Sequence, residues 1–152
     1  MEDYTGACEA RYLDVEALLC FEPMRSTAAI HIGGIAVECQ IKALVLVYHG
    51  IGAWNEQSRR ARDAHYGRSV ARPGHSLVSS VKLMARLYEK AKADPLFIKH
   101  LDQLMHPAGS RDADFIDMHY AANDLDGVNM DAWRKSLNYV RGWLKKNEAS
   151  SK

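Results

Sequence analysis

The chain has 152 residues, of which 47% are hydrophobic and 26% are charged, and its formal net charge at pH 7 is +1. This length is typical of a single domain, and the composition is that of a soluble globular protein rather than a disordered or fibrous one. The small net charge excludes a chain that is basic or acidic throughout. We therefore expect one domain that covers residues 1–152.

The cysteines and the N-terminal segment indicate a reducing environment. Cys8, Cys20 and Cys39 contain no CxxC pair, so we interpret all three as free thiols in a cytoplasmic protein. The opening MEDYTGACEA is polar and acidic, which is not typical of a secretory signal. The most apolar run, residues 28–50, contains two charged residues and a glutamine, and falls short of the ~18–20 uninterrupted apolar residues of a membrane span.

The first two predicted elements are helices joined by a short turn. Residues 8–21 form the first helix, and its inward face is Leu13, Ala17, Leu18 and Phe21. Residues 24–48 form the second helix, which is apolar nearly all round and is therefore expected at the centre of the domain. Pro23 suits the first turn of this second helix, and Gly50 and Gly52 supply a stop signal.

Residues 49–74 are predicted to form a long basic loop without secondary structure. The segment lacks apolar periodicity, and its five arginines stand against Glu56 and Asp63, which gives a local charge of +3. These arginines are Arg59, Arg60, Arg62, Arg68 and Arg72. A basic loop on a near-neutral body suits a phosphate-bearing partner better than a membrane surface, although a solvated loop has the same composition.

Two further helices are predicted after the loop. The first covers residues 76–93, and its inward face is Leu77, Val81, Met84 and Leu87. Asp94 is a suitable N-cap, and Pro95 a suitable first residue, for a short helix that ends before Pro107. Residues 108–128 are irregular and acidic.

The last helix, residues 130–146, has the clearest pattern. Asn129 is a suitable N-cap, and Asp131 favours the positive start of the helix. Its apolar stripe is Met130, Trp133, Leu137, Val140 and Leu144. Residues 147–152 are predicted to fray. Because no strand is predicted, the expected fold class is all-α, an up-and-down bundle of four to five helices.

The same patterns predict the core and the oligomeric state. The side chains expected to be largely buried are Leu44, Leu77, Met84, Trp133, Leu137 and Val140. The last helix carries aromatic residues around its circumference, and the second helix is apolar on all sides. This surplus of apolar surface favours a homodimer with an isologous interface.

Three stretches of the chain resemble one family in sequence and in order. AAIHIGGIAVECQIKALVL has small residues and an E-x-x-x-K core, GHSLVSSVKLM begins with Gly-His-x-Leu, and DFIDMHYAAND precedes the last helix. These stretches resemble the second helix, the start of the next long helix and an Arg-Tyr-containing segment of the HEPN family (higher eukaryote and prokaryote nucleotide-binding domains). The likeness extends from about residue 7 to residue 146, and it implies a small helical bundle.

The resemblance also implies a groove between helices that binds a nucleotide or RNA, often together with a nucleotidyltransferase-type partner protein. The residues expected to line this groove are Arg25, Glu38, Lys42, His75, His119 and Tyr120. Glu38 and Lys42 lie four residues apart with Glu first, the favourable order for a helical ion pair. Because buried charges are costly unless paired or hydrated, we expect this pair at the edge of the groove or of the dimer interface. A surface salt bridge is the structural alternative.

Nuclease members of the family carry an arginine, about four to six further residues and then a histidine, close to the last helix, which act on the RNA phosphodiester. Arg111 and His119 stand at the expected place but have seven residues between them. Arg60 and His65 have the expected spacing but lie in the basic loop. We therefore expect a non-catalytic binding module without metal or cofactor, and keep a metal-independent endoribonuclease and a ligand-free helical scaffold as alternatives.

Overall fold

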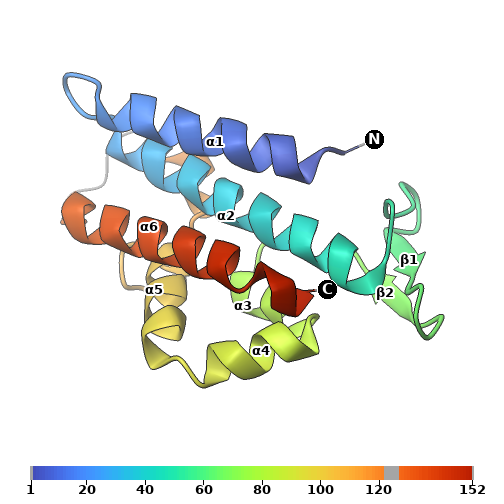
Figure 1. Cartoon of the computed structure of the whole chain (residues 1–152). Coiled ribbons are helices and arrows are strands. Elements are labelled where there is room, and N and C mark those ends of the chain that lie inside the picture. The colour runs from blue at the N-terminus through green and yellow to red at the C-terminus, as the bar shows by residue number, and fades with distance from the viewer. Residues whose placement is uncertain (1, 122–126, 152) are drawn as a thin grey trace.

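The computed structural model describes residues 2–121 and 127–151, and most of these residues lie in helices (Figure 1). The α-helices are α1 (Tyr4–Leu19), α2 (Ser26–His49), α3 (Leu77–Lys82), α4 (Ala85–Lys92), α5 (Pro95–Met105) and α6 (Met130–Lys146). The remaining elements are the 3-10 helices η1 (Asp117–Tyr120) and η2 (Glu148–Ser151) and the strands β1 (Arg60–Arg62) and β2 (Ser69–Ala71). The predicted helical class is confirmed for this part of the chain, but the predicted number of four to five helices is too low, because six α-helices are described.

Helix α2 is the central element, as its composition predicts. It contacts α1, α3, α5, α6 and both 3-10 helices, and α1, α2 and α6 lie side by side in Figure 1. Ile30, Val37 and Ile41 have no exposed surface. By length and composition α2 also meets the criteria for a membrane-crossing helix. The apolar composition of α2 is also that of a core helix, because a helix that packs against neighbours on several sides is apolar nearly all round.

Two glycines let aromatic rings pack directly on the backbone of α2. A Cβ atom added to Gly33 would lie 2.7 Å from Trp133 Cη2, and one added to Gly34 would lie 2.1 Å from Phe115 Cδ2. Both rings are almost completely buried. The absence of a side chain at these two positions therefore permits the close approach of both rings to α2.

The predicted inward face of α1 is wrong. The helix buries Tyr4, Cys8, Tyr12 and Val15, whereas Leu13 is 72% exposed and Phe21, beyond the helix end, is 57% exposed. Apolar residues occur all round α1, so periodicity alone does not select a face. The buried face includes two tyrosines that have polar partners, and Tyr12 donates a 2.8 Å hydrogen bond to the side chain of Gln40. Pro23 lies in the turn before α2 and not in its first turn.

The helix predicted for residues 76–93 is divided into α3 and α4. The chain bends at Leu83 and Met84, where Met84 has φ −114° and ψ 89°, which no helical residue adopts. All four residues of the predicted inward face are nevertheless buried. Of the six predicted core residues five are buried, and the exception is Leu44, which is half-buried and lines a groove.

The basic segment contains a β-hairpin that the sequence did not predict. Strands β1 and β2 pair antiparallel, with Arg60 opposite Ala71 and Arg62 opposite Ser69. Val70 at the centre of β2 is buried, and the hairpin lies beyond the C-terminal end of α2 (Figure 1). A three-residue strand with a single inward residue is too short to produce a recognisable alternation.

The predicted N-caps of α5 and α6 are observed. The aromatic residues of α6 pack within the protein and do not form a free surface. The side chains of Asp94 and Asn129 accept the expected capping hydrogen bonds, at 3.2 and 3.1 Å. The Trp143 ring stacks on Phe97 with 3.8 Å between ring centroids, and its Nε1–H donates to Asp94. Large apolar side chains are exposed elsewhere in the described structure: Leu13 on α1, Phe21 and Met24 between α1 and α2, Val47 near the end of α2, Tyr66 in the hairpin and Leu96 in α5.

Candidate functional site

The charged residues in the middle of α2 form a buried cluster. Lys42 Nζ lies 2.5 Å from Glu38 Oε1, and each residue is only 5% exposed. The second carboxylate oxygen, Glu38 Oε2, lies 2.7 Å from Nδ1 of His75 in the segment before α3. Lys42 Nζ also lies 5.7 Å from the centre of the Tyr4 ring of α1. The cluster therefore connects α1, α2 and the start of α3.

The predicted ion pair between Glu38 and Lys42 is confirmed, but it is not a surface salt bridge. Glu38 and Lys42 are not at a surface, and both carboxylate oxygens and the ammonium group are occupied within the protein. Burial of a charge is tolerated only when partners replace the lost water. We therefore assign Glu38, Lys42 and His75 a structural role. The half-exposed ring of His75 lies at the outer edge of the cluster.

The other expected groove residues lie elsewhere. Arg25 is exposed and precedes α2, thirteen residues before Glu38, which corresponds to about 20 Å along the helix axis. His119 belongs to η1, and its ring centroid lies 5.2 Å from that of His31 on α2. Tyr120 ends η1, and its side chain lies outside the described part of the structure. The six residues expected in one groove therefore lie beside different parts of α2.

The arginine of the candidate nuclease pair near the last helix forms an ion pair within the protein. Arg111 donates to both oxygens of the Asp102 carboxylate, at 2.8 and 3.4 Å, and its side chain is directed toward α5. The neighbouring acids Asp114 and Asp117 accept backbone hydrogen bonds around the start of η1. Within residues 2–121 and 127–151, no group of three or more His, Cys, Asp and Glu side chains is arranged to hold a metal ion.

A histidine and an aspartate fix the hairpin to the helices. Nδ1 of His49, the last residue of α2, lies 2.6 Å from Asp63 Oδ2, and Nε2 lies 2.8 Å from the carbonyl oxygen of Leu83. The His49 ring therefore joins the hairpin to the end of α2 and to the junction of α3 and α4.

Asp63 also organises the hairpin turn. Its Oδ1 accepts hydrogen bonds from the backbone N–H groups of His65 and Tyr66, at 2.8 and 2.7 Å. The hydrogen bond with His49, followed by the one from Tyr66, lowers the pKa of Asp63 to about 2. The carboxylate is therefore charged under all physiological conditions, and its charge is used within the protein.

A cavity of about 740 Å³ opens between the hairpin and the junction of α3 and α4. We call it the hairpin cavity. Its polar and aromatic lining consists of Tyr48, His49, Arg60, Asp63, His65, Tyr66, Arg68, Ser69 and Arg86. Asp63 is the only acid among the lining residues, so the cavity is strongly cationic.

Two of these arginines keep their charge available. Arg60 Nε donates to the neutral hydroxyl of Ser69 at 2.6 Å, and the Arg68 guanidinium lies 5.6 Å from the centre of the Tyr66 ring. Among the residues that the structure describes, neither guanidinium forms an ion pair with a carboxylate. Tyr66 is 80% exposed, so its ring is open for stacking. The sequence indicated the basic charge, but it did not indicate that Tyr48, Arg86 and the hairpin would enclose a space.

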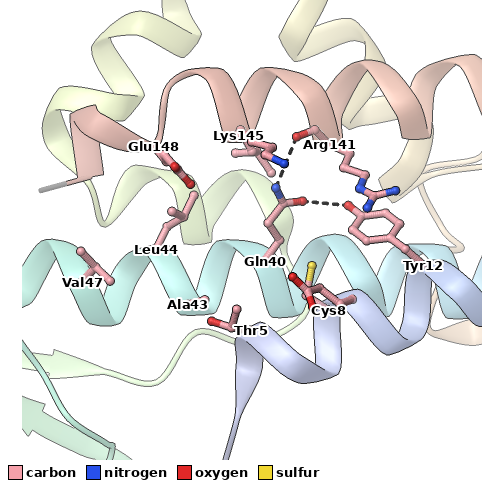
Figure 2. Close-up of a pocket in the computed structure, with 12 residues that line it drawn as sticks. Thr5, Cys8, Tyr12, Gln40, Ala43, Leu44, Val47, Arg141, Lys145 and Glu148 are labelled. Carbon is pink, nitrogen blue, oxygen red and sulfur yellow. Dashed lines mark hydrogen bonds between the residues drawn. The ribbon is translucent and has the colours of Figure 1, made fainter.

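A second opening lies between α1, α2 and α6 (Figure 2). This groove has a volume of about 320 Å³, an apolar floor on α2, and cations from α6 on its rim. Burial raises the pKa of the Cys8 thiol in its wall to about 11, so this cysteine is uncharged and unreactive at neutral pH. All three cysteines of the chain are free thiols.

Comparisons of this chain with protein-family models, with curated proteins and with solved structures found no match. The two openings therefore have to be interpreted from their own chemistry. The hairpin cavity combines exposed aromatic surface with guanidinium groups that form no ion pair among the described residues, whereas the groove is smaller and has charged residues of both signs around an apolar floor.

Proposed function

We propose that this protein is a HEPN-like module that binds RNA or a nucleotide through the hairpin cavity. The observation that carries the proposal is the charge of the lining: among the described residues Arg60 and Arg68 have no carboxylate partner, and the acid of the lining, Asp63, is bound to His49. Guanidinium groups bind phosphate oxygens in bidentate geometry. The exposed rings of Tyr66 and His65 supply surfaces on which a base can stack.

This proposal transfers the binding function from the α2 cluster to the hairpin. The ammonium group of Lys42 is occupied and buried, so it cannot reach a phosphate without breaking the ion pair with Glu38. Arg60 and Arg68 are exposed and already fixed by local contacts, so less conformational entropy is lost when they bind.

The test is a binding titration of a fluorescently labelled single-stranded RNA by fluorescence anisotropy, over a series of salt concentrations. The double variant Arg60→Gln/Arg68→Gln should bind more weakly at low salt. Removing two phosphate contacts should make the salt dependence shallower, by about 1.4 in the slope of log K against log salt concentration.

The matched control is Arg134→Gln/Lys135→Gln, which removes the same charge from an exposed part of α6. It should leave the affinity nearly unchanged. Absence of binding by the parent protein, or equal losses in both double variants, would contradict the proposal and favour a helical scaffold without a ligand.

One observation favours endoribonuclease activity as a second candidate function. Arg60 and His65, which have the spacing of the family's nuclease motif, line the same hairpin cavity. An arginine can neutralise the developing phosphate charge, and a neighbouring histidine can transfer the proton of a ribose hydroxyl. Cleavage of RNA in the presence of EDTA that is lost in His65→Ala, with RNA binding retained, would establish this activity.

The homodimer expected from the sequence is also a proposal, but its surface changes. Because Trp133 and Trp143 are used within the chain, we assign the isologous contact to exposed apolar side chains of α1 and of the segment that follows it, Leu13, Phe21 and Met24. Light scattering of the parent protein and of Leu13→Lys/Phe21→Lys tests it. The parent should give the dimer mass and the variant the monomer mass.

A further inference from the structure

The groove between α1, α2 and α6 has an apolar floor that no other element covers within residues 2–121 and 127–151. Val47 is 51% exposed and Leu44 is half-buried, although both belong to the central helix. Ala43 lies on the same helix beside them (Figure 2), and Leu144 of α6 also lines the groove. Elsewhere α2 is covered by its neighbours, so this opening is a local gap in the packing.

The two cations on the rim of the groove, Arg141 and Lys145, form no ion pair with an acid among the residues that the structure describes. Arg141 lies with its guanidinium carbon 4.1 Å from the centre of the Tyr12 ring, and within the described part of the chain it forms no ion pair. One helical turn later, Lys145 also has no ion pair among the described residues. By contrast Arg134, two turns earlier on α6, forms a 2.7 Å ion pair with Glu16 of α1.

The groove is held open by a fixed polar bridge. Gln40 accepts a hydrogen bond from the Tyr12 hydroxyl at 2.8 Å and donates one to the carbonyl oxygen of Arg141 at 3.3 Å (Figure 2). This amide therefore spaces α1 and α6 across α2. A preformed pocket loses little conformational entropy when a ligand enters.

We propose that this groove binds a small amphipathic anion, namely a carboxylate with an aliphatic chain of about eight carbons. The carboxylate lies between Arg141 and Lys145, and the chain covers Leu44 and Val47. A volume of about 320 Å³ is at the lower end of the range of about 300–1,000 Å³ for small-molecule sites. Glu9 and Glu148 also line the groove, so the sign of the ligand charge has to be tested directly.

The experiment is a titration of the ¹⁵N-labelled full chain with octanoate, followed by NMR, with octylammonium as the cationic counterpart. Octanoate should shift the amide signals of Ala43, Leu44 and Val47 and saturate at one molecule per chain. Octylammonium should bind at least about tenfold more weakly, because one charge-assisted contact is replaced by a repulsion.

Three variants locate the ligand. Arg141→Gln should weaken octanoate binding about tenfold, and Val47→Gln should weaken it by removing apolar contact. Arg134→Gln, on the same helix but in an ion pair outside the groove, should leave it unchanged. Circular dichroism and thermal unfolding check that each variant is folded, and the positions of the shifted signals in the parent protein provide evidence that does not depend on any variant.

Each other result overturns the inference. Equal or tighter binding of octylammonium would assign the rim to a cation held by Glu9 and Glu148. Equal affinities for octanoate in Arg141→Gln and Arg134→Gln would show that the carboxylate is not held by α6. No shifts at Ala43, Leu44 and Val47 would show that the groove is not a binding site. None of these results bears on RNA binding by the hairpin cavity.

Discussion

The middle of α2 and the hairpin that follows it both carry charged residues, but they use these charges in opposite ways. Glu38 and Lys42 stand in the most apolar stretch of the chain, and the structure buries them as a pair completed by His75. Arg60 and Arg68 stand in an unremarkable basic loop, and the structure leaves both guanidinium groups exposed without a carboxylate among the described residues. A charged residue at an unexpected position therefore has a role, but only its partners in the structure show whether that role is to stabilise the fold or to bind a ligand.

The distinction has a physical basis. A buried charge loses its hydration, so it must be paired within the fold and is not available to a ligand. An exposed guanidinium keeps its hydration and gives it up only when a phosphate replaces it. If this comparison is correct, substitutions in α2 change the free energy of unfolding, and substitutions in the hairpin change affinity.

The largest expected effect is that of Lys42→Ala. Removing one partner leaves the Glu38 carboxylate buried with only His75, so the free energy of unfolding should fall by about 3–5 kcal/mol. The exposed pair of Arg134 and Glu16 is the control, because Arg134→Ala should cost about 0–1 kcal/mol. Urea unfolding measures both. If Lys42→Ala had the same free energy of unfolding as the parent, the buried pair would not stabilise the fold.

Gly34→Ala tests how tightly the same helix is packed. Alanine gains up to about 1 kcal/mol over glycine in helix propensity. Because its Cβ would meet the buried Phe115 ring at 2.1 Å, overpacking should dominate and give a net loss of about 1–3 kcal/mol. Gly142→Ala on α6, where nothing lies within 4 Å of the added atom, should instead stabilise by about 0.5–1 kcal/mol. Thermal unfolding of the two variants should therefore shift in opposite directions.

Tyr66→Ala tests the hairpin end of the comparison. Loss of a stacking surface should weaken single-stranded RNA binding by about 1–3 kcal/mol, while the free energy of unfolding changes by less than about 0.5 kcal/mol because the side chain is exposed. Anisotropy and urea unfolding of the same sample measure the two quantities. A variant that loses stability and keeps its affinity would reverse the roles assigned to the two regions.

The smallest effect is a pH dependence at the junction of the two regions. Asp63 has a pKa of about 2 in the folded protein, below the value of about 3.9 for an unperturbed aspartate. A lowered pKa stabilises the fold above about pH 4, and this contribution is lost as the pH falls toward 2. Thermal unfolding at pH 5, 3 and 2 should show a smaller decrease for Asp63→Asn than for the parent. Asp14→Asn, at an exposed ion pair with Arg11, is the control and should follow the parent.

Part of the fold could be read from local patterns. The apolar stripe of α6 and the caps Asp94 and Asn129 depend on residues three or four positions apart. The central position of α2 follows from its apolar composition. These predictions are confirmed. The face of α1 could not be predicted, because that helix is apolar on more than one side and its buried tyrosines are selected by partners such as Gln40.

The sequence by itself determined the helical class, the main core stripes and the net positive charge of residues 49–74. The tertiary structure decided the use of the charged residues, because their partners lie far apart in the chain: His75 is 37 residues from Glu38, and Leu83 is 34 residues from His49. Helix periodicity and capping are local interactions, so a sequence specifies them directly. Burial, pairing and enclosure of a cavity depend on which segments meet in space, and that depends on the packing of the whole chain.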